Sequence, residues 1–150
     1  MNLDGQAKFP MDAETLWERL MDAKVLQACI PGCQEFEAVS ADRYRVLLKL
    51  GVASIAGTYE GKVEITEKRF PSTYVLQITG SGGPGHVSAL ARVHLNPGGE
   101  DHSTLMEYHA QIDVGGTIAS VGQRVLGGIA KLLVNQVIEK LKKEIRATSA

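Results

Sequence analysis

The sequence lacks the features that define several classes of protein. It has two cysteines in 150 residues, too few for a disulfide scaffold, so we expect reduced thiols and a cytoplasmic protein. Cys29 and Cys33 flank a turn and have no third ligand nearby, which disfavours a redox or metal role without deciding it. The N-terminus has no basic segment followed by an apolar stretch, as a signal peptide would have. No run approaches the ~18 apolar residues of a membrane span.

Excess positive charge and catalytic motifs are missing too. The formal net charge of −1 argues against nucleic-acid binding. There is no Gly-x-Ser-x-Gly elbow, Walker loop or His-Glu-x-x-His pair. The histidines have no metal-ligand spacing and are expected on outer strand faces or in a loop; they are His86, His94, His102 and His109. We therefore expect no catalytic residues, metal or cofactor.

What is present is a globular composition, 44% hydrophobic and 22% charged, in a chain long enough for a single domain, residues 1–150. Alternating apolar and polar residues predict six or seven antiparallel strands, over 3–9, 43–50, 58–65, 74–79, 87–95 and 106–114, with a weaker pattern over 34–38. Residues 13–21 and 23–30 are predicted to form two short helices with Asp12 and Asp22 as N-caps. The glycine-rich stretch 80–85 is expected to form a bulge or a wide turn.

The last long segment, Thr117–Arg146, contains no proline and would form an unbroken helix of ~45 Å. A long helix after a run of strands predicts an α+β fold with the helix laid across the sheet. One apolar stripe is the expected core contact: Leu126, Ala130, Leu133, Val137, Leu141 and Ile145. A second stripe needs its own apolar partner, which is a cavity mouth, a self-association interface or a membrane: Ile118, Val121, Val125, Ile129 and Leu132. A kink at Gly127-Gly128 is an alternative to close approach at these glycines.

Several positions on the predicted inner face of the sheet carry small residues: Gly61, Ala89, Ala91 and Ala110. Small side chains there leave room for a cavity under the helix, or they let the helix approach closely. The residues alone do not decide between these two interpretations.

Four segments carry a resemblance to a known family: Asp12–Trp17 (DAETLW), Cys29–Cys33 (CIPGC), Gly57–Gly61 (GTYEG) and Gly115–Gly122 (GGTIASVG). Over residues 1 to about 147 the chain resembles the carbon monoxide dehydrogenase G-subunit family of the START-like (SRPBCC) helix-grip superfamily. The resemblance implies that the predicted strands form a curved antiparallel sheet, which grips the long C-terminal helix and leaves a cavity between them. Family members are associated with molybdenum hydroxylases and are implicated in enzyme assembly, membrane recruitment and quinone carriage.

Residues and resemblance together predict a binding protein, not an enzyme. It would hold a quinone or lipid in an apolar cavity, in support of a membrane-linked molybdenum hydroxylase such as carbon monoxide dehydrogenase, with peripheral contact at the inner membrane face. The alternatives are an assembly or recruitment factor acting through its surface, and a small hydrolase or cyclase of the same fold. The sequence does not decide whether the protein forms a homo-oligomer. The residues expected to line the cavity are Trp17, Leu20, Tyr44, Leu48, Tyr59, Leu76, Ile78, Ala89, Met106, Tyr108, Val121, Val125 and Ile129.

Overall fold

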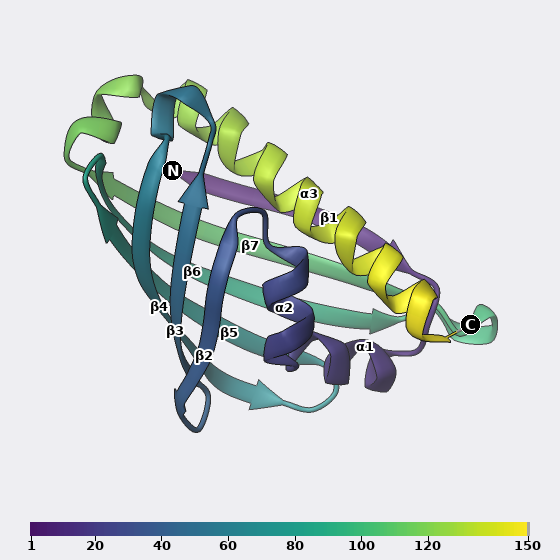
Figure 1. Cartoon of the computed structure of the whole chain (residues 1–150). Helices are drawn as coiled ribbons and strands as arrows, with labels where there is room; N and C mark the ends of the chain where they lie inside the picture. Colours follow the sequence, from purple (N-terminus) through teal and green to yellow (C-terminus); the bar gives the residue numbers. More distant parts are fainter. Residues whose placement is uncertain (150) are drawn as a thin grey trace.

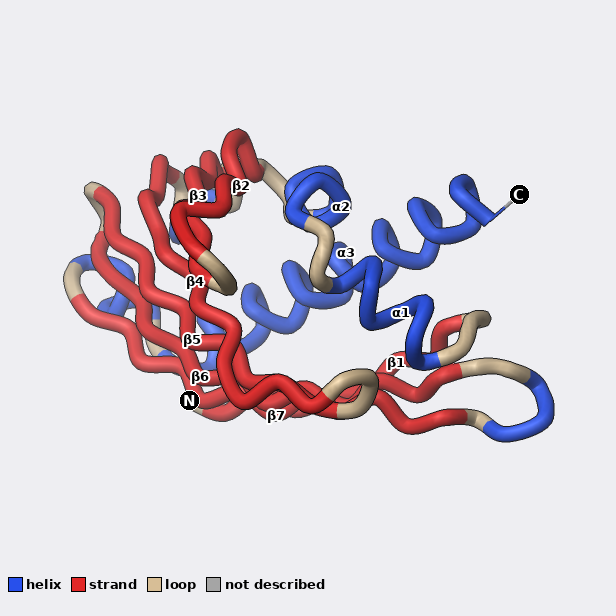
Figure 2. Tube along the Cα trace, turned by 90° about the horizontal axis from the view of Figure 1, so that it is seen from below, coloured by secondary structure: helices blue, strands red, loops and turns tan. Residues whose placement is uncertain are grey.

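The fold is a curved antiparallel sheet with a long helix on its concave side (Figures 1 and 2). The computed structural model describes the backbone of residues 1–149 and the side chains of residues 1–52, 54–99 and 101–144. In this part of the chain seven strands pair in the order β1-β7-β6-β5-β4-β3-β2. Their bounds are Asn2–Phe9 (β1), Cys33–Ser40 (β2), Arg43–Leu50 (β3), Gly57–Arg69 (β4), Thr73–Gly82 (β5), Gly85–Pro97 (β6) and Thr104–Gly115 (β7). The predicted α+β helix-grip architecture is confirmed.

The β5–β6 hairpin is tighter than the sequence predicted. β5 continues through Gly82, which pairs with Gly85, so only Gly83 and Pro84 form the turn. The expected bulge or wide turn over residues 80–85 was therefore wrong. Glycines weaken the strand pattern because they have no side chain, but they do not prevent a backbone ladder from continuing.

Two short helices follow the first strand as predicted. They are α1 (Ala13–Leu20) and α2 (Ala23–Cys29). The Asp12 carboxylate accepts a hydrogen bond of 2.9 Å from the Thr15 amide, and Asp22 accepts one of 2.9 Å from the Lys24 amide. These bonds satisfy amides that have no partner within a helix, which is why both helices begin where they do.

The C-terminal segment is not one unbroken helix. A 3₁₀ turn, η3 (Thr117–Val121), precedes the long helix α3 (Gln123–Ser149), and Gly122 separates them with φ 96°. A left-handed φ is open to glycine at little cost and breaks the helical path. Gly127 and Gly128 lie inside α3, so the break comes one turn earlier than the kink considered from the sequence. Two further 3₁₀ turns are η1 (Ala53–Ile55) and η2 (Gly99–Asp101).

The second half of α3 packs against a solid hydrophobic core. Ile138 and Leu141 are 6% and 2% exposed and pack with Phe9, Leu16 and Leu95. Each such buried side chain stabilises the fold by about 1.5–3 kcal/mol. The side chain of Ile145, the last residue of the predicted core stripe, lies outside the described residues. This cluster anchors the C-terminal half of the helix on the sheet.

The first half of α3 belongs to a separate and smaller cluster. Its buried members are Ile55, Ile118 and Leu126. They come from η1, η3 and the first turn of α3, all at the opposite end of the sheet from α1 (Figure 1). The two clusters close opposite ends of the space between the helix and the sheet, and this arrangement positions the cavity.

Candidate ligand-binding cavity

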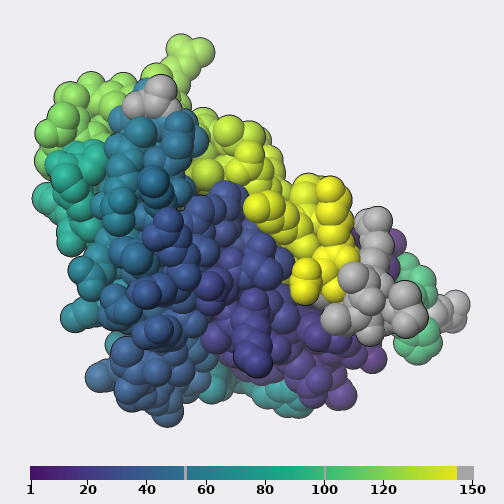
Figure 3. All heavy atoms as spheres, viewed as in Figure 1, coloured from purple at the N-terminus to yellow at the C-terminus, as the bar shows by residue number. Residues whose placement is uncertain are grey.

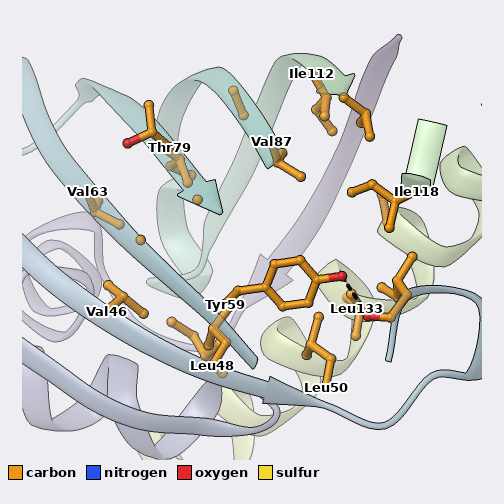
Figure 4. A pocket seen from close by; sticks show the side chains of 18 of the residues that line it. Val46, Leu48, Leu50, Tyr59, Val63, Thr79, Val87, Ile112, Ile118 and Leu133 are labelled. Carbon is orange, nitrogen blue, oxygen red and sulfur yellow. Dashed lines mark hydrogen bonds between the residues drawn. The ribbon is translucent and has the colours of Figure 1, made fainter. Parts of the chain in front are cut away.

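A cavity of about 370 Å³ lies between the concave face of the sheet and the first half of α3. Its walls combine β2 to β7 with η1, η3, the end of α2 and one face of α3 (Figure 4). The lining residues are Met1, Ile30, Phe36, Val46, Leu48, Leu50, Ile55, Tyr59, Gly61, Lys62, Val63, Ile78, Thr79, Gly80, Val87, Ala89, Ile112, Val114, Ile118, Leu126, Ile129, Ala130 and Leu133. Its volume lies within the usual range for small-molecule sites, roughly 300–1,000 Å³.

The cavity wall is almost entirely apolar. Lys62 and Thr79 occupy outward-pointing positions of β4 and β5, so their backbone, not their side chains, reaches the interior. Among the described lining residues, Tyr59 is then the one whose side chain brings a polar group into the wall. The cavity therefore favours hydrocarbon over polar or charged groups.

The hydroxyl of Tyr59 is already engaged. It donates a hydrogen bond of 2.7 Å to the carbonyl oxygen of Ile55 in η1, and Figure 4 shows the ring between the sheet and that segment. Burial raises the pKa of Tyr59 above its ordinary value, so the phenol stays neutral at physiological pH. The hydroxyl therefore holds η1 in place and is not a free partner for a ligand.

One end of the cavity is closed by backbone contacts between distant segments. The amide of Ile118 donates a hydrogen bond of 2.8 Å to the carbonyl oxygen of Pro84, which ties η3 to the β5–β6 turn. The N-terminal ammonium of Met1 donates one of 2.7 Å to the carbonyl oxygen of Ile112, and the Met1 residue lines the cavity. Ile55 and Ile118 are buried at this end and belong to the same small cluster.

Comparison with known proteins identifies the family. The sequence profile of the carbon monoxide dehydrogenase G subunit (CoxG) matches residues 5–146. The chain belongs to the CoxG family. None of the curated proteins matches it in sequence. The resemblance seen in the sequence is thus confirmed.

Solved structures support the fold of this CoxG-family chain. A conserved protein from Geobacillus kaustophilus is 36% identical, with a TM-score of 0.95 over 99% of this chain and 97% of that one. TTHA0849 from Thermus thermophilus is 12% identical, with a TM-score of 0.74 over 100% of both chains. A START superfamily protein from Mycobacterium smegmatis is 12% identical, with a TM-score of 0.74 over 98% of both. At 12% identity the last two show the fold alone.

Five of the thirteen predicted residues lie on the cavity wall of this CoxG-family protein: Leu48, Tyr59, Ile78, Ala89 and Ile129. Six others belong to or pack against the solid core instead: Trp17, Leu20, Tyr44, Leu76, Met106 and Tyr108. Strand alternation identifies the inner face correctly, but it does not say where along the strands the helix leaves the sheet. The aromatic residues illustrate this, since the Trp17 ring packs edge-on against Tyr74 with centroids 5.3 Å apart, in the filled part of the interior.

The two predicted stripes of α3 do not divide core from cavity. Leu126, Ala130 and Leu133 of the expected core stripe line the cavity together with Ile129 of the second stripe. Val121 packs against the smaller cluster, whereas Val125 is 49% exposed on the solvent side, so neither lines the cavity. Other lining residues could have been found by alternation, such as Val46 and Val63. Met1, Ile30 and Ile55 follow no periodic pattern.

Only some of the small residues on the inner face of the sheet line the cavity. Gly61 and Ala89 line the cavity, whereas Ala91 and Ala110 pair with each other outside it. Small residues therefore open space over only part of the sheet.

The thiols and imidazoles of the CoxG-family chain lie apart from the cavity lining. Cys29 is buried and Cys33 half-buried, both are free, and burial raises the pKa of each thiol, which disfavours the reactive thiolate. The histidines are exposed, and His94 and His109 share a polar groove on the outer face of the sheet. Within the described side chains, no group of three or more His, Cys, Asp or Glu could hold a metal ion. No helix in the described part of the chain has the length and hydropathy to cross a membrane.

Proposed function

We propose that this CoxG-family protein binds a lipophilic small molecule in the cavity under α3. The observation that carries the proposal is a cavity of about 370 Å³ with an apolar wall, whose one inward polar side chain among the described residues is already hydrogen-bonded. Such a wall gains free energy from apolar contact at about 25 cal/mol per Å² and offers nothing to a polar solute.

A quinone or a lipid fits this description, because each joins a long hydrocarbon part to a compact polar head. With no free polar side chain among the described wall residues, the hydrocarbon part enters and the head remains at the opening. The family's association with carbon monoxide dehydrogenase supports a role beside a membrane-linked molybdenum hydroxylase at the inner membrane face.

The same wall supports a binding protein over a hydrolase or cyclase of this fold. General acid–base catalysis needs an ionisable group within hydrogen-bond reach of the substrate. The inward ionisable side chain among the described wall residues is Tyr59, whose hydroxyl is engaged and whose pKa is raised.

Organic extraction of the purified protein followed by mass spectrometry tests the proposal. We expect a co-purifying lipid or quinone, and an increase in Tm when decylubiquinone is added to extracted protein. Ala89→Trp, which fills the cavity from β6, should abolish both signals. An empty extract together with no increase in Tm would contradict the proposal.

A surface role is the second candidate, and the solvent face of α3 favours it. Val125 and Leu132 are 49% and 51% exposed, and the exposed cations Arg124 and Lys131 lie beside them. Exposed apolar side chains among basic residues are typical of recruitment to a partner or an anionic surface. If Ala89→Trp still pulls down a molybdenum hydroxylase while Val125→Ser/Leu132→Ser does not, the surface carries the function.

A further inference from the structure

Two glycines face each other in the middle of the cavity wall. Gly61 of β4 pairs directly with Gly80 of β5. They belong to one cross-strand row on the inner face, which consists of Val46, Gly61, Gly80, Val87 and Val114 in successive neighbouring strands. All five line the cavity. Side chains directly opposite each other in such a row are normally in contact, so the two glycines leave a notch between flanking valines.

The two glycines differ in what requires them. A Cβ at Gly61 would come within 2.8 Å of the Thr79 carbonyl oxygen, so a side chain there would force the backbone to shift. A Cβ at Gly80 would meet nothing closer than the Glu60 carbonyl oxygen at 3.9 Å, which is ordinary contact. Gly80 also has no left-handed φ that would favour glycine. Neither backbone conformation nor neighbouring atoms require glycine at position 80.

Glycine in a strand interior has a cost, since it loses more conformational freedom on folding than alanine and has no side chain to pack. At Gly80 the missing side chain yields only empty volume in the cavity. We infer that Gly80 is a specificity-determining residue: with Gly61 it sets the width of the hydrocarbon that the cavity accepts, so that methyl-branched, polyprenyl-like chains fit as well as linear ones. This inference rests on the proposed function.

The helix side of the cavity also has a small lining residue. Ala130 lines the cavity from α3, so the wall opposite the sheet also has a small side chain in its lining. A linear alkyl chain does not need the notch, whereas the lateral methyl groups of a polyprenyl chain do. Adding carbon atoms at position 80 should therefore affect branched chains first.

The test compares two neutral probes, dodecanol and farnesol, whose main chains are equally long but of which only farnesol carries methyl branches. Binding to wild type, Gly80→Ala and Gly80→Val is measured by displacement of a fluorescent apolar dye. We expect wild type to bind both probes. Gly80→Val adds three carbon atoms and should weaken farnesol binding by about 10-fold or more, since a single methylene in a hydrophobic pocket already has an effect of about that size. It should change dodecanol binding much less.

Thermal stability distinguishes a glycine that shapes the cavity from a glycine that the fold requires. Gly80→Ala should raise Tm by about 1–4 °C while weakening farnesol binding, because it removes the entropic cost of glycine. Ser81→Val is the matched control, since Ser81 is the exposed neighbour on the same strand and does not line the cavity. It should leave both affinities unchanged.

The outcomes separate the inference from the proposed function. Suppose that the wild-type protein binds both probes. The inference would be overturned if Gly80→Val left the farnesol affinity unchanged, or if Ser81→Val lowered it as much as Gly80→Val does. The proposed function would still stand in either case. A decrease in Tm for Gly80→Ala would also overturn the inference, since glycine would then be required structurally. If the wild-type protein binds neither dodecanol nor farnesol, both the inference about Gly80 and the proposed function are contradicted.

Discussion

At the residue scale, Tyr59 links the wall of the cavity to the segment η1 that closes one end of it. Its hydroxyl joins β4 to η1, and η1 supplies Ile55 to one end of the cavity. Tyr59→Phe should lower the free energy of unfolding by about 1 kcal/mol, the net value of such a bond, and should speed probe release because η1 is held less firmly. Chemical denaturation and stopped-flow displacement measure the two effects.

Tyr44→Phe is the matched control for Tyr59→Phe, because no hydrogen bond involving the Tyr44 hydroxyl occurs among the described residues. It should leave stability and probe release close to wild type. Equal behaviour of the two variants would show that the bond between Tyr59 and Ile55 has no part in closing the cavity.

The ionisation state of the cavity predicts how binding depends on pH. Burial raises the pKa of Tyr59 from its ordinary value of about 10, and the side chain of Lys62 lies on the outer face of the sheet. The affinity for farnesol should therefore be constant between about pH 5 and pH 7. Because the folded protein holds the phenol proton more tightly than the unfolded chain does, the stability that Tyr59 contributes should be lost only as pH rises above about 10. A titration midpoint between about pH 5 and pH 7 in the binding curve would contradict this account.

At the element scale, α3 divides into a half over the cavity and a half on the core. Leu141 is 2% exposed in the core, whereas Leu133 lines the cavity and is half-buried. Leu141→Ala should cost about 2–5 kcal/mol, and Leu133→Ala roughly 1–2 kcal/mol because its contacts are incomplete on the cavity side. Urea denaturation measures both; equal losses would mean that the cavity is filled or collapsed in solution.

The exposed apolar residues of α3 should contribute little to folding. Val125→Ser/Leu132→Ser should change the free energy of unfolding by no more than about 0.5 kcal/mol per site, as is usual for surface substitutions. The affinity for farnesol should be unchanged, because neither residue lines the cavity. A large loss of stability would instead show that this face is covered in solution, for example by a second copy of the chain.

The sequence predicted which helices and strands are present better than it predicted where they begin and end. Alternation located six strands clearly and β2 only weakly, and Asp12 and Asp22 marked both short helices, because these signals are local. The break at Gly122 was missed because a glycine near a helix start is equally compatible with a continuous helix. Its left-handed φ depends on the path that η3 takes toward Pro84, which is a tertiary contact.

At the scale of the whole molecule, the curvature of the sheet and the path of α3 decide where the interior is filled. The space-filling view shows α3 lying beside α2 on one face (Figure 3). Strand parity placed Tyr44 and Tyr108 on the inner face correctly, yet they lie at the core end, whereas Tyr59 reaches the cavity. The distance between a helix and a sheet varies along both, and no local pattern encodes it.

The central claim is that a lipophilic molecule occupies the space under the first half of α3. Intermolecular NOEs between bound farnesol and methyl-labelled protein test it most directly. The account predicts NOEs to the methyl groups of Leu48, Ile78 and Leu133, which line the cavity, and none to those of Ile138 and Leu141 in the solid core. NOEs confined to Val125 and Leu132 on the surface, or absent altogether at saturating farnesol, would contradict it.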